Sequence, residues 1–239
     1  MTEQDVISRV LYRDGLMIVL DKPAGIPVHA GPGKGPNLEQ YFDALRFGFP
    51  RPPGLAHRLD RDTTGCLVLG RHPKALRRLG KLFMDGKVEK TYWAVVRGRP
   101  SQDEGRMDFP LLRVRQKDGW RILVDGKGQE SVTDYRVFGC SPDGALTWLE
   151  LYPRTGRTHQ IRVHCTHVGL PIVGEPFYCS PEIRGSRPGR EGIPLHLHSR
   201  AITLPLYPNR DAVTVSADPP AHMLAALKAC GYRIPEQAA

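Results

Sequence analysis

The sequence lacks a long apolar run and a paired set of cysteines. No stretch of its 239 residues approaches the roughly 20 apolar residues that a membrane-spanning helix requires. Its five cysteines are an odd number, and no Cys-x-x-Cys pair occurs, which argues against a disulfide framework or a structural zinc site. We therefore expect a soluble cytoplasmic protein with buried thiols and no membrane partner.

Acidic residues are also scarce relative to basic ones. The chain has 34 Lys and Arg against 25 Asp and Glu, a net charge of +9, which favours an anionic partner. No phosphate-binding loop, dinucleotide fingerprint or metal-ligand cluster is present. His196 and His198 would point to the same side of a strand, but no third ligand is visible. We expect no cofactor and no metal.

Hydrophobic periodicity predicts a mixed α+β protein in one or two domains. Strands are expected at residues 16–20, 88–97, 131–138, 145–152, 195–204 and 212–216. Helices are expected after the capping residue Asn37, at residues 73–85, from Thr158 to a C-cap at Gly169, and from Pro220 to Gly231. Many strands, few helices and short turns indicate a mainly antiparallel sheet with flanking helices.

Residues 57–65, HRLDRDTTG, form the first polar cluster. Asp60 lies between Arg58 and Arg61, and the segment runs through a Thr-Thr-Gly turn into an apolar strand. A carboxylate held by guanidinium groups stays ionised, so it can serve as a nucleophile or an electrostatic anchor but is a poor general acid. Taken alone, the segment also fits a surface loop whose charges pair with one another.

A second polar cluster lies a hundred residues later and carries a resemblance. The segments 57–65 (HRLD-x-x-T-T-G) and 154–164 (RTGRTHQIRVH), with Lys90-Thr91-Tyr92 between them, resemble the RluA-like family of RNA pseudouridine synthases. Residues 21–28 are similar to the family's KP-x-G-x-x-V opening. Residues 169–175 are similar to its G-x-P-[IV]-x-GD segment, with Glu175 in place of the usual Asp.

The resemblance implies a pseudouridine synthase fold, in which an antiparallel sheet is bisected and an RNA-binding cleft crosses its middle. Many relatives carry a small RNA-binding domain before the catalytic one. Here the catalytic pattern begins within about the first ten residues. We therefore expect residues 1–239 to be a single catalytic domain without a separate N-terminal RNA-binding domain.

The resemblance also implies the reaction and its residues. The enzyme would isomerise a specific uridine of tRNA or rRNA to pseudouridine after flipping the base out of its stack. Asp60 matches the catalytic aspartate. Tyr92 matches an active-site aromatic residue whose ring can stack on the flipped uracil and whose hydroxyl can bond or shuttle the proton that leaves C5. If its segment is helical, Arg162 shares a face with Thr158, and its guanidinium could hold Asp60 through a bidentate pair. The alternative is an ordinary arginine on the helix surface. We expect a monomer acting on an RNA stem-loop.

Contacts to RNA are expected from Arg58, His57, Arg157 and His159. The segments 99–130 and 178–193 are rich in Arg, Gly and charge. They are candidates for target recognition and for disorder without RNA. An alternative is a non-catalytic protein that binds structured RNA on the same scaffold. The patterns of a zinc deaminase and of a two-carboxylate glycoside hydrolase are missing. The target RNA and the route taken by Asp60 stay open.

Overall fold

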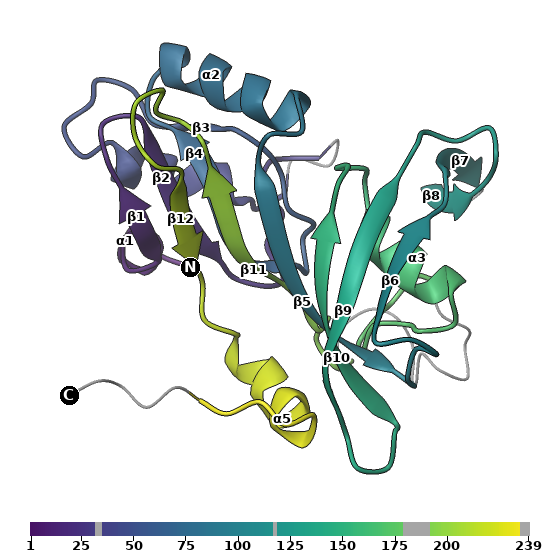
Figure 1. Ribbon diagram of the computed structural model, residues 1–239. Coiled ribbons are helices and arrows are strands. Elements are labelled where there is room, and N and C mark those ends of the chain that lie inside the picture. Colours follow the sequence, from purple (N-terminus) through teal and green to yellow (C-terminus); the bar gives the residue numbers. More distant parts are fainter. Residues whose placement is uncertain (32–34, 117–118, 179–191, 235–239) are drawn as a thin grey trace. The chain divides into compact units, whose positions relative to one another are not determined.

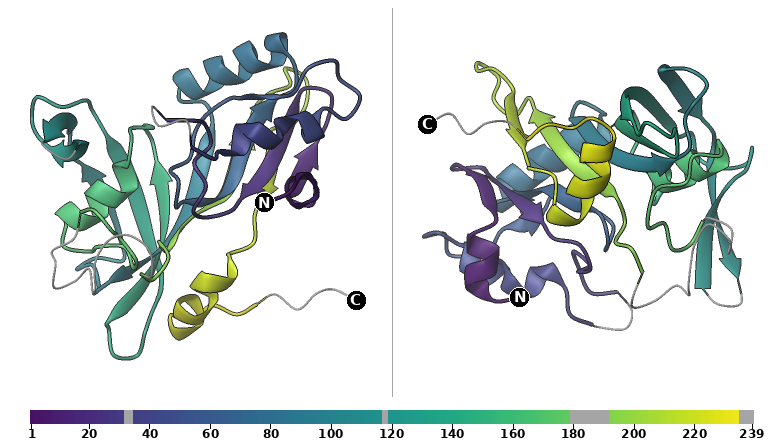
Figure 2. Two further views of the ribbon diagram at one scale, coloured as in Figure 1. Left: turned by 180° about the vertical axis from the view of Figure 1, so that it is seen from behind. Right: turned by 90° about the horizontal axis from the view of Figure 1, so that it is seen from below.

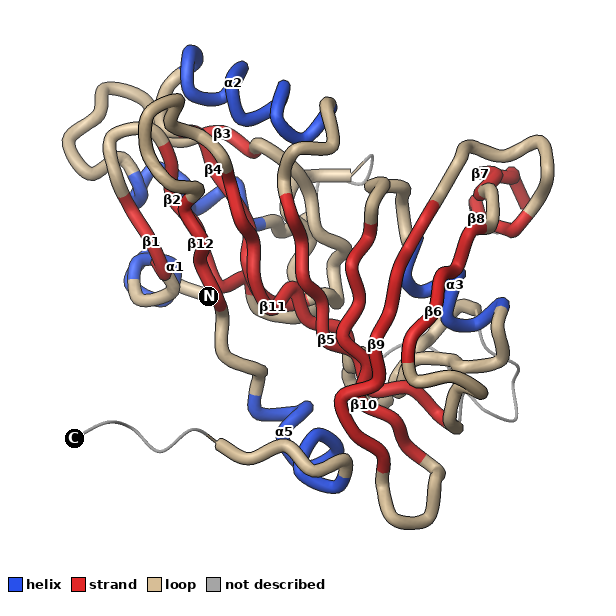
Figure 3. Tube along the Cα trace, viewed as in Figure 1, coloured by secondary structure: helices blue, strands red, loops and turns tan. Residues whose placement is uncertain are grey.

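The structure is a computed structural model that describes residues 1–31, 35–116, 119–178 and 192–234. Strands outnumber helices (Figure 1 and Figure 3), which confirms the mixed α+β class. Residue contacts divide the chain into two compact units. The first unit comprises Met1–Tyr92 and His198–Asp218, and the second comprises Trp93–Leu197 and Pro219–Ala239. The single catalytic domain stays a prediction.

A sheet forms the centre of the first unit. Its strands are β1 (Val10–Arg13), β2 (Met17–Lys22), β3 (Gly54–Leu55), β4 (Thr64–Gly70), β11 (Leu197–Leu204) and β12 (Val213–Ser216). Strands β1, β2, β4 and β11 follow one another in that order, with β3 paired to β4 and β12 paired to β11. β4 and β11 run parallel, whereas the other pairs named here are antiparallel.

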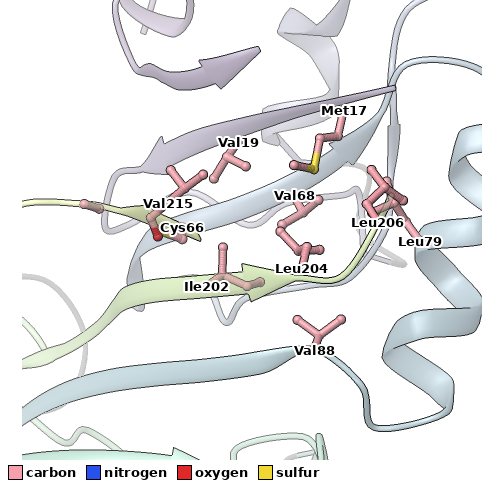
Figure 4. Close-up of a cluster of buried hydrophobic side chains, with 11 residues drawn as sticks. Met17, Val19, Cys66, Val68, Leu79, Val88, Ile202, Leu204, Leu206 and Val215 are labelled. Carbon is pink, nitrogen blue, oxygen red and sulfur yellow. The ribbon is translucent and has the colours of Figure 1, made fainter. Parts of the chain in front are cut away.

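Both faces of this sheet are covered, because side chains alternate between the faces of a strand. Met17 and Val19 of β2 join a core that includes Leu79 of helix α2 (Pro73–Met84) (Figure 4). Ile18 and Leu20 join a second core with α1 (Glu3–Ile7) and η1 (Leu38–Leu45). α2 and η1 therefore lie over opposite faces of the sheet (Figure 2). This double burial explains why β2 and β4 are continuous apolar runs.

The helix after Asn37 differs in detail from the prediction. It is a 3-10 helix, and the Asn37 side chain makes no capping hydrogen bond to it. Instead, the Asn37 side-chain amide donates to the Gly35 carbonyl at 3.2 Å. Leu38, Phe42 and Leu45 are buried, so the predicted apolar stripe is correct although the helix type is not.

The second unit contains a further set of antiparallel strands. Its strands are β6 (Glu104–Asp108), β9 (Val132–Cys140) and β10 (Leu146–Pro153), with β9 between the other two. Strand β5 (Glu89–Arg97) begins in the first unit and continues into the second. Helix α3 (Gln160–His167) contacts β9 and β10. Helix α5 (Ala221–Ala229) packs Met223 and Leu227 against Trp93 and Trp148.

The expected disorder of residues 99–130 is wrong for most of that segment. Strand β6 pairs with β9, and β7 (Leu111–Gln116) pairs with β8 (Gly119–Val124) as a separate two-stranded ribbon. The ribbon is ordered because it buries hydrophobic side chains, including Leu111 and Ile122. The many charged residues of the segment made this apolar face hard to recognise in the sequence. Most of the other segment, residues 178–193, lies outside the described residues.

Four of the five cysteines lie among the described residues. Cys66, Cys165 and Cys230 are buried free thiols, and Cys140 is partly buried, while Cys179 lies outside the described residues. Among the described residues, no helix combines the length and apolar character needed to span a membrane.

Candidate active site

The segment that carries Asp60 leads directly into β4 of the first unit. Leu59 is 7% exposed and belongs to the core on the η1 side of the sheet. Asp60 follows it and is only partly buried, whereas Arg58 is exposed. The Thr63 amide donates to the Asp60 carbonyl at 3.3 Å, which closes a tight turn before β4. Leu59 thus anchors the loop while its neighbours on either side keep access to solvent.

The ammonium group of Lys22 binds this loop through hydrogen bonds to backbone carbonyls. Its side chain is completely buried, and its Nζ donates to the carbonyls of Pro23 at 2.8 Å, Arg61 at 2.8 Å and Thr63 at 2.9 Å. All three ammonium protons therefore have acceptors, and two of these acceptors flank Asp62. Burial lowers the pKa of Lys22 to about 8, an effect that the charges of Asp62 and Asp60 partly offset. These contacts show a structural role for Lys22.

Gly65 lets the loop join the sheet at close range. It pairs with Lys22 of β2 and Ser199 of β11, and its φ of +99° is one that L-residues rarely adopt. A Cβ at this position would lie 2.2 Å from the Ser199 carbonyl oxygen. Only glycine fits this position without a shift of the backbone.

Tyr92 lies near Asp60 within the same unit. The Asp60 carboxylate contributes to raising the pKa of the Tyr92 phenol, after the larger effect of burial. The phenol also shares a side-chain hydrogen bond with Ser199, whose Oγ donates to the Cys66 carbonyl at 3.4 Å. Tyr92 is therefore a neutral hydrogen-bonding group at physiological pH and not a base.

Arg61 does not flank Asp60 in the way the sequence suggested. Its guanidinium pairs with Asp62, with Nε 3.1 Å from Oδ1. The alternative of neighbouring charges that pair with one another is therefore correct for Arg61 and Asp62, although not as a description of the whole segment.

His57 lies inside the first unit and serves its scaffold. Its Nε2 accepts a hydrogen bond from the Val68 amide at 3.0 Å, and its ring stacks on Phe83 with centroids 4.5 Å apart. Burial, together with the charge of Lys90, lowers the pKa of His57 to about 3. These contacts fit a structural role rather than the expected contact with RNA.

The two histidines at the start of β11 likewise have internal partners. His198 lies 2.8 Å from Thr64 Oγ1 and 3.0 Å from the Ala217 carbonyl. His196 lies 2.7 Å from the Pro194 carbonyl and packs edge-on against His222. In the part of the chain that the structure describes, no three His, Cys, Asp or Glu side chains gather as a metal site would require.

Arg162 belongs to the second unit and is buried, which is against the alternative of an ordinary helix-surface arginine. Its Nε donates to Glu175 Oε2 at 2.8 Å and its Nη2 donates to Oε1 at 2.9 Å. The two side chains are 2% and 0% exposed. The Glu175 Oε1 also accepts from the amides of Phe177 and Tyr178, at 2.8 and 3.3 Å. A bidentate pair of this kind fixes the plane of the guanidinium.

His159 and Arg157 lie just before α3. His159 is the N-cap of the helix with a φ of +53°, and its Nδ1 lies 2.6 Å from the Tyr178 hydroxyl. Arg157 is exposed, and its Nε donates to the Glu130 carbonyl at 3.2 Å. Both side chains therefore lie close to solvent in the second unit, where contact with a large ligand is feasible.

The first unit thus brings together two of the three predicted catalytic residues, Asp60 and Tyr92. The roles of two supporting residues were missed, those of Ser199 and Glu175. For Glu175 a signal was present, since it replaces the usual acid of its segment and sits thirteen residues after Arg162. Ser199 gave no signal, because a serine in an apolar strand is an ordinary residue.

Comparisons with known proteins show which family the chain is similar to. A family model described as RNA pseudouridylate synthase matches residues 16–167. The chain is 48% identical to an uncharacterised RNA pseudouridine synthase from Zymomonas mobilis, over 72% of this chain and 79% of that protein. It is 36% identical to ribosomal large subunit pseudouridine synthase C of Buchnera aphidicola, over 73% of this chain and 55% of that protein.

The fold is similar to that of a solved human structure, RNA pseudouridylate synthase domain containing 4. The TM-score is 0.79 with 24% sequence identity, and the match covers 98% of this chain and 97% of the human one. At this identity the likeness concerns the fold alone, and it confirms the predicted fold class.

Proposed function

Because the chain belongs to the family of RNA pseudouridine synthases, whose general reaction is an isomerisation, we propose that it converts a specific uridine of tRNA or rRNA to pseudouridine with Asp60 as its catalytic residue. The observation that carries this proposal is the partly buried Asp60 carboxylate beside Tyr92, on a loop that the ammonium of Lys22 holds. A non-catalytic RNA-binding protein would have no use for a carboxylate placed in this way.

The reaction breaks the bond between N1 of uracil and C1′ of ribose and forms a bond between C5 and C1′. C5 releases its proton to solvent and N1 takes up one proton from solvent, so that atoms and charge balance and no electrons enter or leave. Asp60 acts as the nucleophile at C1′ or as the base that removes a ribose proton to give a glycal. Both routes require an ionised carboxylate and a target base that has left its stack.

Tyr92 contributes a ring and a neutral hydroxyl to this site. Its raised pKa keeps the phenol protonated at physiological pH, so the hydroxyl donates a hydrogen bond but does not accept the proton of C5 as a phenolate would. The ring offers a face on which the flipped uracil stacks. Tyr92 therefore orients the base during its rotation.

Arg162 is proposed as the third catalytic residue. Its bidentate pair with Glu175 fixes the direction in which the guanidinium points. Because Glu175 compensates the buried charge of Arg162, the guanidinium keeps one orientation. In that orientation it is suited to hold a carboxylate or a phosphate at the site. Glu175 then acts as a positioning residue for Arg162.

RNA binding is proposed for exposed groups that lie within the two motifs. Arg58 and Arg157 are exposed, and each offers a guanidinium to a phosphate. The net charge of +9 supports this electrostatic attraction. One relative is named for the large ribosomal subunit, which supports rRNA as one candidate target, and a monomer acting on a stem-loop remains our proposal for the assembly.

Mapping of pseudouridines tests this function. Total RNA from cells with and without the gene is compared at single-nucleotide resolution, and the purified protein is then added to the RNA that lacks the modification. We expect at least one site to disappear with the gene and to return with the protein. Binding to RNA without the appearance of pseudouridine at any site would favour the non-catalytic alternative.

A further inference from the structure

Trp120 is an unusual residue of the second unit because it is much more exposed than the other two tryptophans. The chain has three tryptophans. Trp93 and Trp148 are 7% and 8% exposed, whereas Trp120 is 42% exposed. A large aromatic side chain left in water contributes little to the core and is a frequent sign of an interaction site.

The ribbon that carries Trp120 is fixed to the body of the second unit. Leu111 of β7 and Ile122 of β8 are buried against Val163 of α3. Strand register places Arg115 directly opposite Trp120. Trp120 lies two residues before Ile122, on the same side of the strand. Its position is therefore set by the packed part of the ribbon.

Two groups that commonly contact nucleic acids surround the indole. The Arg113 guanidinium carbon lies 4.5 Å from its ring centroid. The His159 ring lies 5.3 Å away with an interplanar angle of 35°. His159 is itself held by Tyr178 and has a backbone conformation that is rare for a residue with a side chain. Strained residues of this kind concentrate at functional sites.

The charge of the ribbon matches an anionic partner. The sequence 111–124 contains three arginines and one lysine against a single aspartate. Arg113 and Arg115 are exposed, and neither forms an ion pair with another described residue. An aromatic ring within a set of cations is the composition that binds single-stranded nucleic acid, because the bases stack on the ring and the cations meet the phosphates.

We propose that Trp120 is a stacking platform for an unpaired base of the RNA substrate, with His159 beside it and Arg113 contacting a neighbouring phosphate. The proposal rests on the proposed function, since it supplies a second contact for the RNA that the enzyme modifies. Trp120 takes no part in the chemistry at the target uridine. It binds a base that is exposed in a loop or bulge, which favours structured RNA with unpaired nucleotides over continuous duplex.

Binding of two labelled 20-mers, measured by fluorescence anisotropy, tests the platform. One 20-mer consists of uridines, and the other has the same ribose-phosphate chain without bases. For the uridine 20-mer we expect Trp120→Ala to weaken binding about tenfold and Trp120→Phe to weaken it less than about threefold, since a benzyl ring still stacks. For the chain without bases, both variants should bind like the wild type.

Leu123→Ala is the matched control. Leu123 lies on the same ribbon with the same 42% exposure, so its truncation should leave both affinities unchanged. Equal affinity of Trp120→Ala and wild type for the uridine 20-mer would overturn the proposal. So would a loss of equal size on the chain without bases, or a wild type that binds neither oligonucleotide.

These binding measurements do not depend on catalysis. A tenfold loss in a protein that forms no pseudouridine would support the platform while the proposed function fails. Pseudouridine formation by a protein whose Trp120→Ala variant binds normally would leave the function intact and remove only the platform. Thermal unfolding of each variant confirms that its fold is retained.

Discussion

The α-carbon of Gly65 faces the carbonyl oxygen of Ser199 so closely that a Cβ would lie 2.2 Å from it. The same strand contact places Ser199 where its hydroxyl meets Tyr92. Gly65 follows Asp60 by only five residues, so the packing of β4 against β11 determines where the Asp60 loop ends. The site is therefore sensitive to changes in backbone packing as well as to changes in its reactive groups.

Gly65→Ala is expected to destabilise the fold by about 3 kcal/mol, because the new methyl group clashes with backbone and the φ of +99° strains any L-residue. Urea unfolding measures this change. Gly80→Ala is the control, since a Cβ there meets nothing within 4 Å. Inside α2 that substitution should stabilise by up to about 1 kcal/mol. Equal stability of the two variants would contradict the account of Gly65.

The rate of pseudouridine formation is expected to fall above pH 8, because Lys22 loses its charge. Its lowered pKa of about 8 means that the ammonium is charged below this pH and neutral above it. A neutral amine has two protons for three carbonyl acceptors, so the Asp60 loop is held less firmly. The rate of pseudouridine formation as a function of pH checks this, with saturating RNA.

The pKa of Lys90 is also lowered to about 8 by burial, so variants are needed to assign the effect to Lys22. Lys90→Gln should keep the alkaline decline, and Lys22→Met should be slow at every pH, without a decline near pH 8. A Lys22→Met enzyme with the wild-type rate and profile would show that these hydrogen bonds do not position the loop.

Tyr92→Phe should lower the turnover about tenfold, the effect of losing one hydrogen bond, while RNA binding is unchanged. The benzyl ring still stacks on the base, but the bond to Ser199 is lost. Tyr92→Leu removes the stacking face as well and should be slower still. Single-turnover rates with saturating enzyme compare the three proteins. A phenylalanine variant as slow as the leucine variant would assign the whole effect to the hydroxyl.

The free energy of unfolding should fall in acid, because the folded protein keeps His57 unprotonated. Its pKa is about 3 in the folded protein against an ordinary value of 6.5. Between these values the unfolded chain binds a proton that the folded chain excludes. Its stabilising contribution is thus complete above pH 6.5 and is lost as the pH falls towards 3. This residue should add a slope of up to about 1.4 kcal/mol per pH unit to the free energy of unfolding.

Urea titrations at a series of pH values measure that slope. His57→Gln keeps an acceptor for the Val68 amide but does not titrate. Between pH 3 and pH 6.5, this variant should take up about one proton fewer per molecule on unfolding than the wild type. The same uptake in both proteins would mean that His57 is protonated in the folded state, and this would contradict the internal role described for it.

The sequence predicted the elements better than the partners of polar residues. Apolar runs such as residues 16–20 and the amphipathic pattern of residues 73–85 identify a buried strand and a helix, because periodicity is local. Residues 104–124 were misread since their charges hide a thin apolar face. The ion pair of Arg162 with Glu175 and the burial of His57 depend on segments far apart in the chain, which no local pattern reveals.

The central claim concerns Asp60 and is tested most directly by Asp60→Asn, which keeps the size of the side chain and removes its charge. Wild-type and variant proteins with the same unfolding temperature are incubated with RNA that lacks the modification, and pseudouridine at the mapped site is measured. The account predicts no pseudouridine above background with the variant, although it still binds the RNA. Formation of pseudouridine by Asp60→Asn at the wild-type rate would contradict it.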